Sequence, residues 1–240
     1  MKKQLRALVP LPLVLLALLG CGKDSSTNPP DNPAPEFVPS DFVAGVDSPF
    51  MPLIPGTVLI YEGESDGQIE RVEYEITAQT KVILGVTCMV VRDRVYFDGE
   101  LEEDTFDWYA QHDNGDVWYF GEDSKEIANG QVVSTEGSWE AGVDGAKPGI
   151  LIKATPVVGD TYQQEYYEDE AEDMAQVVAL DATATTPLAT YTNCLKTKEW
   201  NPLDSEALPE FKFYARGVGM VREEAIGGDA VLELVEIRRP

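Results

Sequence analysis

The side chains that could do chemistry in this chain are one histidine, three cysteines and many carboxylates. The 240 residues include 43 acidic and 18 basic residues and a lone histidine, His112. A single histidine excludes multi-histidine metal centres. A serine triad would have to use His112 as its base, and the chain has no G-x-S-x-G elbow. Asn114-Gly115 follows closely and is typical of a tight turn, so we interpret His112 as a half-exposed strand residue.

The carboxylates are so numerous that their abundance does not indicate catalysis. The formal net charge is -25, which disfavours nucleic acid and anionic lipid headgroups as partners. A glycosidase needs one pair of carboxylates, and no pair stands out in this sequence. We therefore expect a protein that is not an enzyme, with a glycan hydrolase as the weakest alternative.

The densest acidic run is EYYEDEAEDM, residues 165–174. Calcium takes six to eight oxygen ligands, so such a run could hold this ion. The alternative is a solvated loop between two strands, which is the more common role of a charge run. No other cofactor is expected. The candidate calcium ligands are Glu168, Asp169, Glu170, Glu172 and Asp173.

Two further groups of residues each have a functional and a structural interpretation. Cys88 and Cys194 could form a disulfide in an oxidising compartment, or they could be two separate buried thiols. A set of aromatic residues in or near one predicted hairpin could line an apolar cavity, or it could fill the core. The candidate ligand-facing aromatic residues are Trp108, Tyr109, Trp118, Tyr119 and Trp139.

The first 40 residues predict where the protein is located. Residues 1–20 have a basic start and an apolar stretch that is too short to span a bilayer, as in an export signal. Leu18-Leu19-Gly20-Cys21 resembles the bacterial lipobox, which implies cleavage before Cys21 and acylation of its thiol. The partner is then a membrane, reached through a lipid anchor. Because Gly22 and not aspartate follows, the resemblance favours the outer membrane.

The rest of the chain divides into a tether and a body. Residues 21–40 are rich in proline and small polar residues, so we predict a disordered tether. Residues 41–240 are predicted to form a single β-rich domain. Alternating apolar and polar residues, as in residues 69–77, predict half-buried strands, and four Asp-Gly or Asn-Gly dipeptides predict hairpins. We expect an all-β, mainly antiparallel, curved meander sheet forming a half-barrel or distorted barrel, with weak helices at 168–174 and 203–208.

Four segments of the body resemble a widespread group of uncharacterised bacterial lipoproteins: PLIPGTVLIYEGE, DWYAQ with VWYFGED, GSWEAGVDGAKPGI and FYARGVGMV. The last segment is also similar to a strand-turn-strand of LolA/LolB-like envelope lipoproteins. That likeness implies a curved sheet that holds acyl chains. The leading expectation is therefore a non-catalytic protein of the bacterial cell envelope that binds an apolar or amphipathic ligand, such as a lipid. A structural or interaction protein with an acidic, calcium-binding surface is the alternative.

Overall fold

The computed structural model describes residues 34–65 and 67–240. The predicted signal peptide, Cys21 and most of the tether therefore lie outside the described residues. Nearly all regular structure within them is strand, and the one helix in this part of the chain is the short 3₁₀ turn η1, Pro39–Asp41. No helix in this region is long and apolar enough to cross a membrane. The all-β, antiparallel prediction is confirmed.

Both predicted short helices are wrong. Residues 168–174 form a tight turn in which Asp169 has a positive φ of 62°, followed by the start of a strand. In residues 203–208, side-chain oxygens of Asn201 and Asp204 accept hydrogen bonds from the backbone N–H groups of Leu203 and Glu206. These local bonds compete with the hydrogen bonds of a helix.

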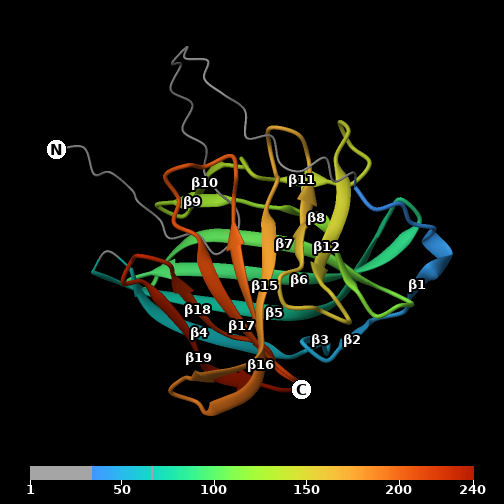
Figure 1. The fold of residues 1–240 in the computed structure, drawn as a ribbon. Coiled ribbons are helices and arrows are strands. Elements are labelled where there is room, and N and C mark those ends of the chain that lie inside the picture. The colour runs from blue at the N-terminus through green and yellow to red at the C-terminus, as the bar shows by residue number, and fades with distance from the viewer. Residues whose placement is uncertain (1–33, 66) are drawn as a thin grey trace.

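One wall of the molecule is a five-strand meander, coloured from blue-green to green in Figure 1. Each strand pairs antiparallel with the next. On β5 the polar side chains of Arg71, Glu73 and Glu75 alternate with Val72 and Ile76, which are buried in the interior. The strands are β4 (Val58–Ser65), β5 (Gln68–Ile83), β6 (Val86–Phe97), β7 (Glu100–His112) and β8 (Val117–Asp123).

A second meander forms the other wall, and its last strand pairs with β4. This pairing joins the two ends of the body and makes Leu234 the Cα partner of Tyr61. The strands are β15 (Met174–Thr185), β16 (Thr190–Trp200), β17 (Glu210–Ala215), β18 (Gly219–Ala225) and β19 (Val231–Arg238).

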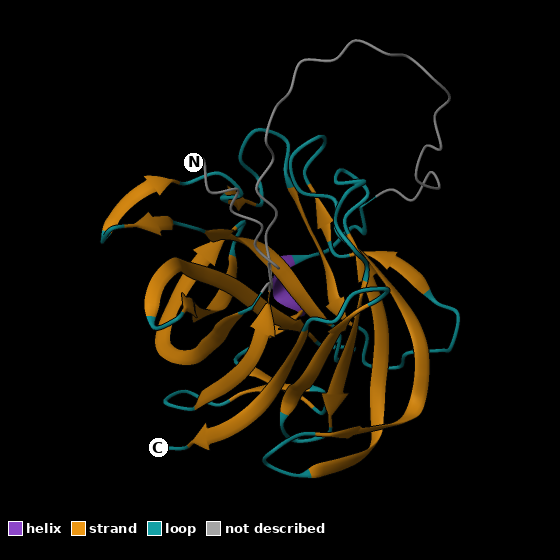
Figure 2. Ribbon diagram, turned by 90° about the vertical axis from the view of Figure 1, so that its left-hand side faces the viewer, coloured by secondary structure: helices purple, strands orange, loops and turns teal. Residues whose placement is uncertain are grey.

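Short strands bridge the two walls on the other side. β12 pairs with β8 and with β14, and β13 pairs with β15. The antiparallel sheet is thereby nearly closed into a barrel, and Figure 2 shows its strands wrapping around an interior. The bridging strands are β11 (Trp139–Glu140), which pairs with β8, β12 (Lys147–Ile152), β13 (Thr161–Gln163) and β14 (Glu165–Tyr166).

The remaining strands lie at the ends and on the outside. The rings of Phe37 and Phe42 lie 5.7 and 5.5 Å from the ring of Trp118. The segment 37–42 therefore covers an aromatic patch on the outside of the wall. These strands are β1 (Phe42–Val43), which pairs with β7, the pair β2 (Val46–Ser48) and β3 (Met51–Leu53), and the hairpin β9 (Glu126–Ala128) and β10 (Gln131–Ser134).

The hairpin around Asn114-Gly115 differs from the prediction in register. A two-residue turn would place Gln111 opposite Trp118, but the chain turns over more residues and Gln111 faces Val117. The Asn114 side chain accepts the backbone N–H of Asp116 at 2.8 Å, which stabilises the longer turn. The shift by one residue decides which side chains enter the barrel.

Candidate functional site

The predicted aromatic set is divided between the two faces of the wall. Tyr109 and Tyr119 are Cα partners with stacked rings 4.9 Å apart, and Trp139 meets Tyr119 edge-on at 5.4 Å. These three line the interior. Trp108 and Trp118 occupy the opposite face of their strands, where Lys81 Nζ lies 3.3 Å from the ring centroid of Trp108 and the preceding segment covers Trp118. All five are buried, so they do not form one ligand-facing surface.

The predicted calcium site is not assembled. The tight turn leaves Glu168, Asp169 and Glu170 exposed to solvent, while Asp173 points towards the barrel interior near Lys212. Among residues 34–65 and 67–240, no three acidic, histidine or cysteine side chains lie where they could hold a metal ion together. Glu172 Oε1 instead accepts the backbone N–H of Asp169 at 3.2 Å, which closes the turn.

The predicted disulfide is not formed, because Cys88 and Cys194 are both free and buried. Cys88 belongs to the hydrophobic cluster around β6 to β8, whereas Cys194 belongs to a second cluster around β17 to β19. Burial raises the pKa of the Cys88 thiol to about 12, so this thiol is unreactive at neutral pH.

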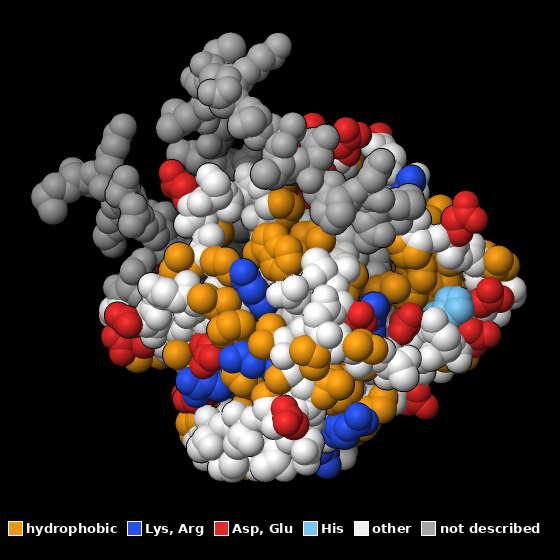
Figure 3. All heavy atoms as spheres, viewed as in Figure 1, with side chains coloured by type: hydrophobic (Ala, Val, Ile, Leu, Met, Phe, Trp, Pro, Cys, Tyr) orange, Lys and Arg blue, Asp and Glu red, His pale blue; other side chains and the backbone are white. Residues whose placement is uncertain are grey.

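His112 is a surface residue, as predicted. Its Nδ1 lies 2.9 Å from Asp113 Oδ1, and its ring packs edge-on against Phe42 at 5.3 Å. On the face drawn in Figure 3, acidic, basic and hydrophobic side chains are interspersed, and no patch of one charge sign dominates it. The outer surface therefore does not explain the acidity of the chain on this side.

Much of the unusual acidity lies inside the barrel. Inward positions on the strands and on the segments that bridge them carry ten carboxyl groups, where an ordinary barrel core carries apolar side chains. One inward lysine, Lys212, accompanies them. Six of the acids are buried: Glu70, Asp107, Glu122, Glu165, Glu199 and Glu223. Four are half-buried: Asp93, Glu103, Asp173 and Glu210.

Strand register explains how two of these acids come to lie beside the indole of Trp139. Asp107 on β7 is the Cα partner of Glu122 on β8, and Glu122 is the Cα partner of Trp139 on β11. Partners in a ladder share one face of the sheet. Gly121 makes this possible, because a Cβ there would lie 2.2 Å from the carbonyl oxygen of Trp139. We call Asp107, Glu122, Trp139 and the neighbouring Glu165 the acid row.

The acid row lacks partners for its polar atoms. Both oxygens of Glu122, one oxygen of Glu165 and the indole N–H of Trp139 are buried, and no well-aligned hydrogen bond within 3.5 Å reaches them from the described residues. The Tyr119 hydroxyl and the Trp139 indole are nevertheless close enough to lower the pKa of Glu122 and of Glu165, respectively. Asp107 is better satisfied, since the Tyr119 hydroxyl donates to its Oδ1 at 2.7 Å. None of the three acids is in an ion pair within the described part of the chain. Leaving such groups unpaired costs about 1–3 kcal/mol each, more for charged groups.

Burial raises the pKa of these carboxyls, and repulsion between them adds to the effect for Glu122 and Glu165. The pKa of Asp107 rises to about 6, although its hydrogen bonds from Tyr119 and Tyr109 act in the other direction. The pKa values of Glu122 and Glu165 lie well above the usual range. The environment of these two groups therefore disfavours their ionised form unless a cation lies beside them.

A second group of inward acids is neutralised by the chain itself. The ammonium of Lys212 lies 3.2 Å from Glu199 Oε2 and 3.6 Å from Glu223 Oε2. Hydroxyl groups of Thr197 and Tyr214 donate to Glu199 Oε1 at 2.6 and 3.1 Å. Together with Glu210 on β17, whose Cα partner is Glu199, these residues form what we call the lysine cluster.

Neither group was predicted from the sequence, because acids at every second position are the usual pattern of a strand face that is exposed to solvent. The available signal was that Asp107, Tyr109 and Gln111 alternate with Trp108 and Ala110, so that neither set is a typical exposed face. All five residues are buried.

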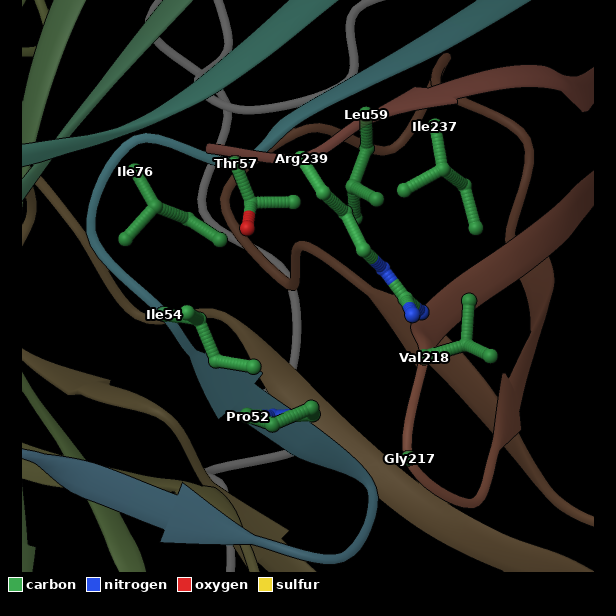
Figure 4. A pocket seen from close by; sticks show the side chains of 9 residues that line it. All are labelled: Pro52, Ile54, Thr57, Leu59, Ile76, Gly217, Val218, Ile237 and Arg239. Atoms are coloured by element: carbon green, nitrogen blue, oxygen red, sulfur yellow. The ribbon is translucent and has the colours of Figure 1, made fainter.

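A separate depression of about 280 Å³, a volume that includes open solvent, lies at one end of the barrel. Figure 4 shows mainly aliphatic side chains such as Ile54, Leu59 and Val218 around it, with the Arg239 side chain reaching across. Ligand sites usually combine an apolar wall with several convergent polar groups. This depression has few of them, so it is a weaker candidate than the acid row.

Comparisons with known proteins leave the family open. No protein-family model matches the chain, and no curated protein does. A solved structure that matches is that of a protein of Bacteroides fragilis inferred to be exported, with a YmcC-like fold. It is 15% identical, the match covers 80% of this chain and 100% of that one, and the TM-score is 0.47. A match of this strength carries no information about function, and the resemblance to bacterial lipoproteins stays a prediction.

Proposed function

We propose that this chain is an exported, lipid-anchored envelope protein whose barrel binds a small cationic, amphipathic ligand without catalysis. The observation that supports it is the composition of the interior: ten inward carboxyl groups against one lysine. Burying acids is unfavourable unless protons or cations neutralise them. Strongly perturbed groups of this kind cluster at functional sites.

The composition of the interior also narrows the chemical class of the ligand, which the sequence predicts to be apolar or amphipathic. A purely apolar ligand would leave the carboxyl groups unsatisfied, whereas a ligand with a cationic head would pair with them. Inward apolar residues such as Val72, Val95 and Leu234, together with the inward tyrosines, offer contacts for an apolar body. The predicted anchor at Cys21 and the outer-membrane location belong to the same proposal and rest on the lipobox alone.

A non-catalytic role fits this arrangement better than the two alternatives. A glycan hydrolase needs its two carboxylates at a cleft that a polysaccharide can enter, and the acids here lie in the barrel interior. The alternative is a calcium-dependent surface protein. It loses its support because the acidic side chains of residues 168–173 do not come together as a metal site.

The test is native mass spectrometry on the full chain, purified from the envelope of an expressing cell in a neutral detergent. Spectra before and after mild organic extraction are compared. A copurifying mass of a few hundred daltons that carries an amine and that extraction removes supports the proposal. A folded protein that carries no such mass, and whose unfolding midpoint no added cation or amphiphile raises, contradicts it.

A further inference from the structure

The lysine cluster shows how this barrel holds an ammonium group. Lys212 places its Nζ between carboxylate oxygens of Glu199 and Glu223, at 3.2 and 3.6 Å. The lysine is 5% exposed, so protein groups replace most of its hydration. A primary ammonium has three N–H donors and no acceptor, and two carboxylate oxygens lie beside that of Lys212.

The acid row presents the same kind of acceptors without a donor. Three carboxylate oxygens, two on Glu122 and one on Glu165, have no hydrogen-bond partner among the described residues. Both side chains are 1% exposed. The unpartnered indole N–H of Trp139 lies on the side of Glu165, and Trp139 shares the ladder position of Glu122. The indole N–H is a donor, so it faces the carboxyl group of Glu165 and offers no acceptor to a cation.

The chemistry of these groups selects among cations. A metal ion needs several oxygens around one point, and no such group of three side chains exists in the described part of the chain. A quaternary ammonium has no N–H to donate, and the nearest tyrosine rings, Tyr109 and Tyr119, stack on each other. A primary ammonium offers only donors, and the oxygens of Glu122 and Glu165 that lack a well-aligned hydrogen bond are acceptors.

We propose that the acid row binds the primary ammonium group of a small amphipathic ligand, as the lysine cluster holds the ammonium of Lys212. This inference rests on the proposed function and names the chemical class of the ligand and its site. Asp107 contributes through Oδ1, which already accepts from Tyr119 at 2.7 Å, and provides negative charge beside Glu122.

The experiment is calorimetric titration of the full chain in neutral detergent with four probes, three of which share a hexyl chain. They are hexylammonium, hexyltrimethylammonium, hexanol and calcium. Hexylammonium should bind at least about tenfold more tightly than the others, because it alone satisfies the carboxylate oxygens with charge-assisted bonds. A fifth probe, dihexanoyl phosphatidylethanolamine, distinguishes a lipid headgroup from a free amine, and tighter binding of either one supports the site.

The matched variants are Glu122→Gln in the acid row and Glu62→Gln on the outer face of β4, where Glu62 pairs with Arg71. Glu122→Gln replaces a buried carboxyl group that is hard to ionise with an amide of the same shape, so it should fold. It should lower hexylammonium affinity about tenfold or more, while Glu62→Gln leaves the affinity unchanged. If the quaternary probe or calcium binds best, or if Glu122→Gln binds hexylammonium normally, this inference is overturned while the proposed function stands. If no probe binds and no ligand copurifies, both fail.

Discussion

The lysine cluster and the acid row are built from similar side chains in one barrel, yet their charges are balanced differently. In the lysine cluster, Lys212 lies between Glu199 and Glu223, and hydroxyl groups satisfy the remaining oxygen of Glu199. Glu223 Oε2 accepts no well-aligned hydrogen bond, but the charge of Lys212 lies 3.6 Å away. In the acid row, Glu122 has neither a cation nor a hydrogen-bond partner among the described residues. The difference shows that a barrel can bury carboxylates in two ways: it neutralises them with its own cation, or it leaves that role to protons and a ligand.

The largest expected effect is that of pH on stability. Burial raises the pKa of Glu70 and Glu103 to about 8, of Asp173 to about 7 and of Glu210 to about 9. The folded chain therefore holds more protons than the unfolded chain between about pH 5 and pH 8, and the free energy of unfolding falls as the pH rises. Each extra proton held across those three pH units contributes about 4 kcal/mol.

Urea unfolding between pH 5 and pH 9 measures this slope. The carboxyl groups that face one another across the interior and whose pKa is raised are Glu70, Asp93, Glu103, Asp107, Glu122, Glu165, Asp173, Glu210 and Glu223. Lys212 stays charged throughout. A stability that is flat or that rises over this range would mean that the interior acids are ionised in the folded chain and need no protons to be buried.

Removing the internal cation should be the next largest effect. Lys212→Met leaves Glu199 and Glu223 buried without their partner, which typically costs about 3–5 kcal/mol. The control is Lys198→Met on the same sheet, because Lys198 is half-buried and its Nζ lies 5.4 Å from the ring of Trp200. Unfolding in urea at pH 7 compares the two. Equal losses for both variants would show that Lys212 does not neutralise its cluster.

Neutralising one acid should have opposite signs in the two regions. Glu122→Gln at pH 8 removes a group that is unpartnered and hard to ionise, so it should stabilise the chain by about 1–3 kcal/mol. Glu199→Gln weakens the ion pair with Lys212 and should destabilise the chain by a similar amount. Thermal unfolding of both variants provides the measurement. If both substitutions destabilised the chain, Glu122 would have stabilising partners like those of Glu199, and the difference between the two regions would be wrong.

The smallest effect is expected at the exposed acidic turn. Glu168→Gln should change the free energy of unfolding by less than about 0.5 kcal/mol, because the side chain is solvated. Calcium at millimolar concentration should leave the unfolding midpoint of the native chain unchanged. The prediction would be wrong if calcium raised the unfolding midpoint of the native chain and had no effect on the Glu168→Gln variant. That result would support a calcium site at this turn.

The fold followed from the sequence further than the site did. Hairpins at Asp98-Gly99 and Asn129-Gly130 form with the positive φ angles expected of their residues, and the strand predicted at residues 69–77 lies within β5. Local turn chemistry and alternation determine these features. The register at Asn114-Gly115 was missed because it depends on a longer turn that the Asn114 side chain stabilises.

The site depends on contacts that local patterns do not contain. The longer turn shifts the register by one residue from Gln111 to Tyr109, and a bulge between Asp107 and Tyr109 restores the pairing of Asp107 with Glu122. Lys212 reaches Glu223 only because β17 pairs with β18. Whether an acid on a strand faces solvent or the interior is decided when the barrel closes through β19 and β4, between residues far apart in the chain.

The central claim is that the acid row binds the ammonium group of a ligand in the way that the lysine cluster holds the side-chain ammonium of Lys212. Hexylamine labelled with ¹⁵N, bound to the full chain in neutral detergent, allows the ammonium protons to be followed by nuclear magnetic resonance. We predict a slowly exchanging ammonium signal with magnetisation transfer to the indole N–H of Trp139, and loss of that signal in Glu122→Gln. A bound amine whose protons exchange freely, or whose transfer goes to Trp200 on the outside of β16, would contradict the account.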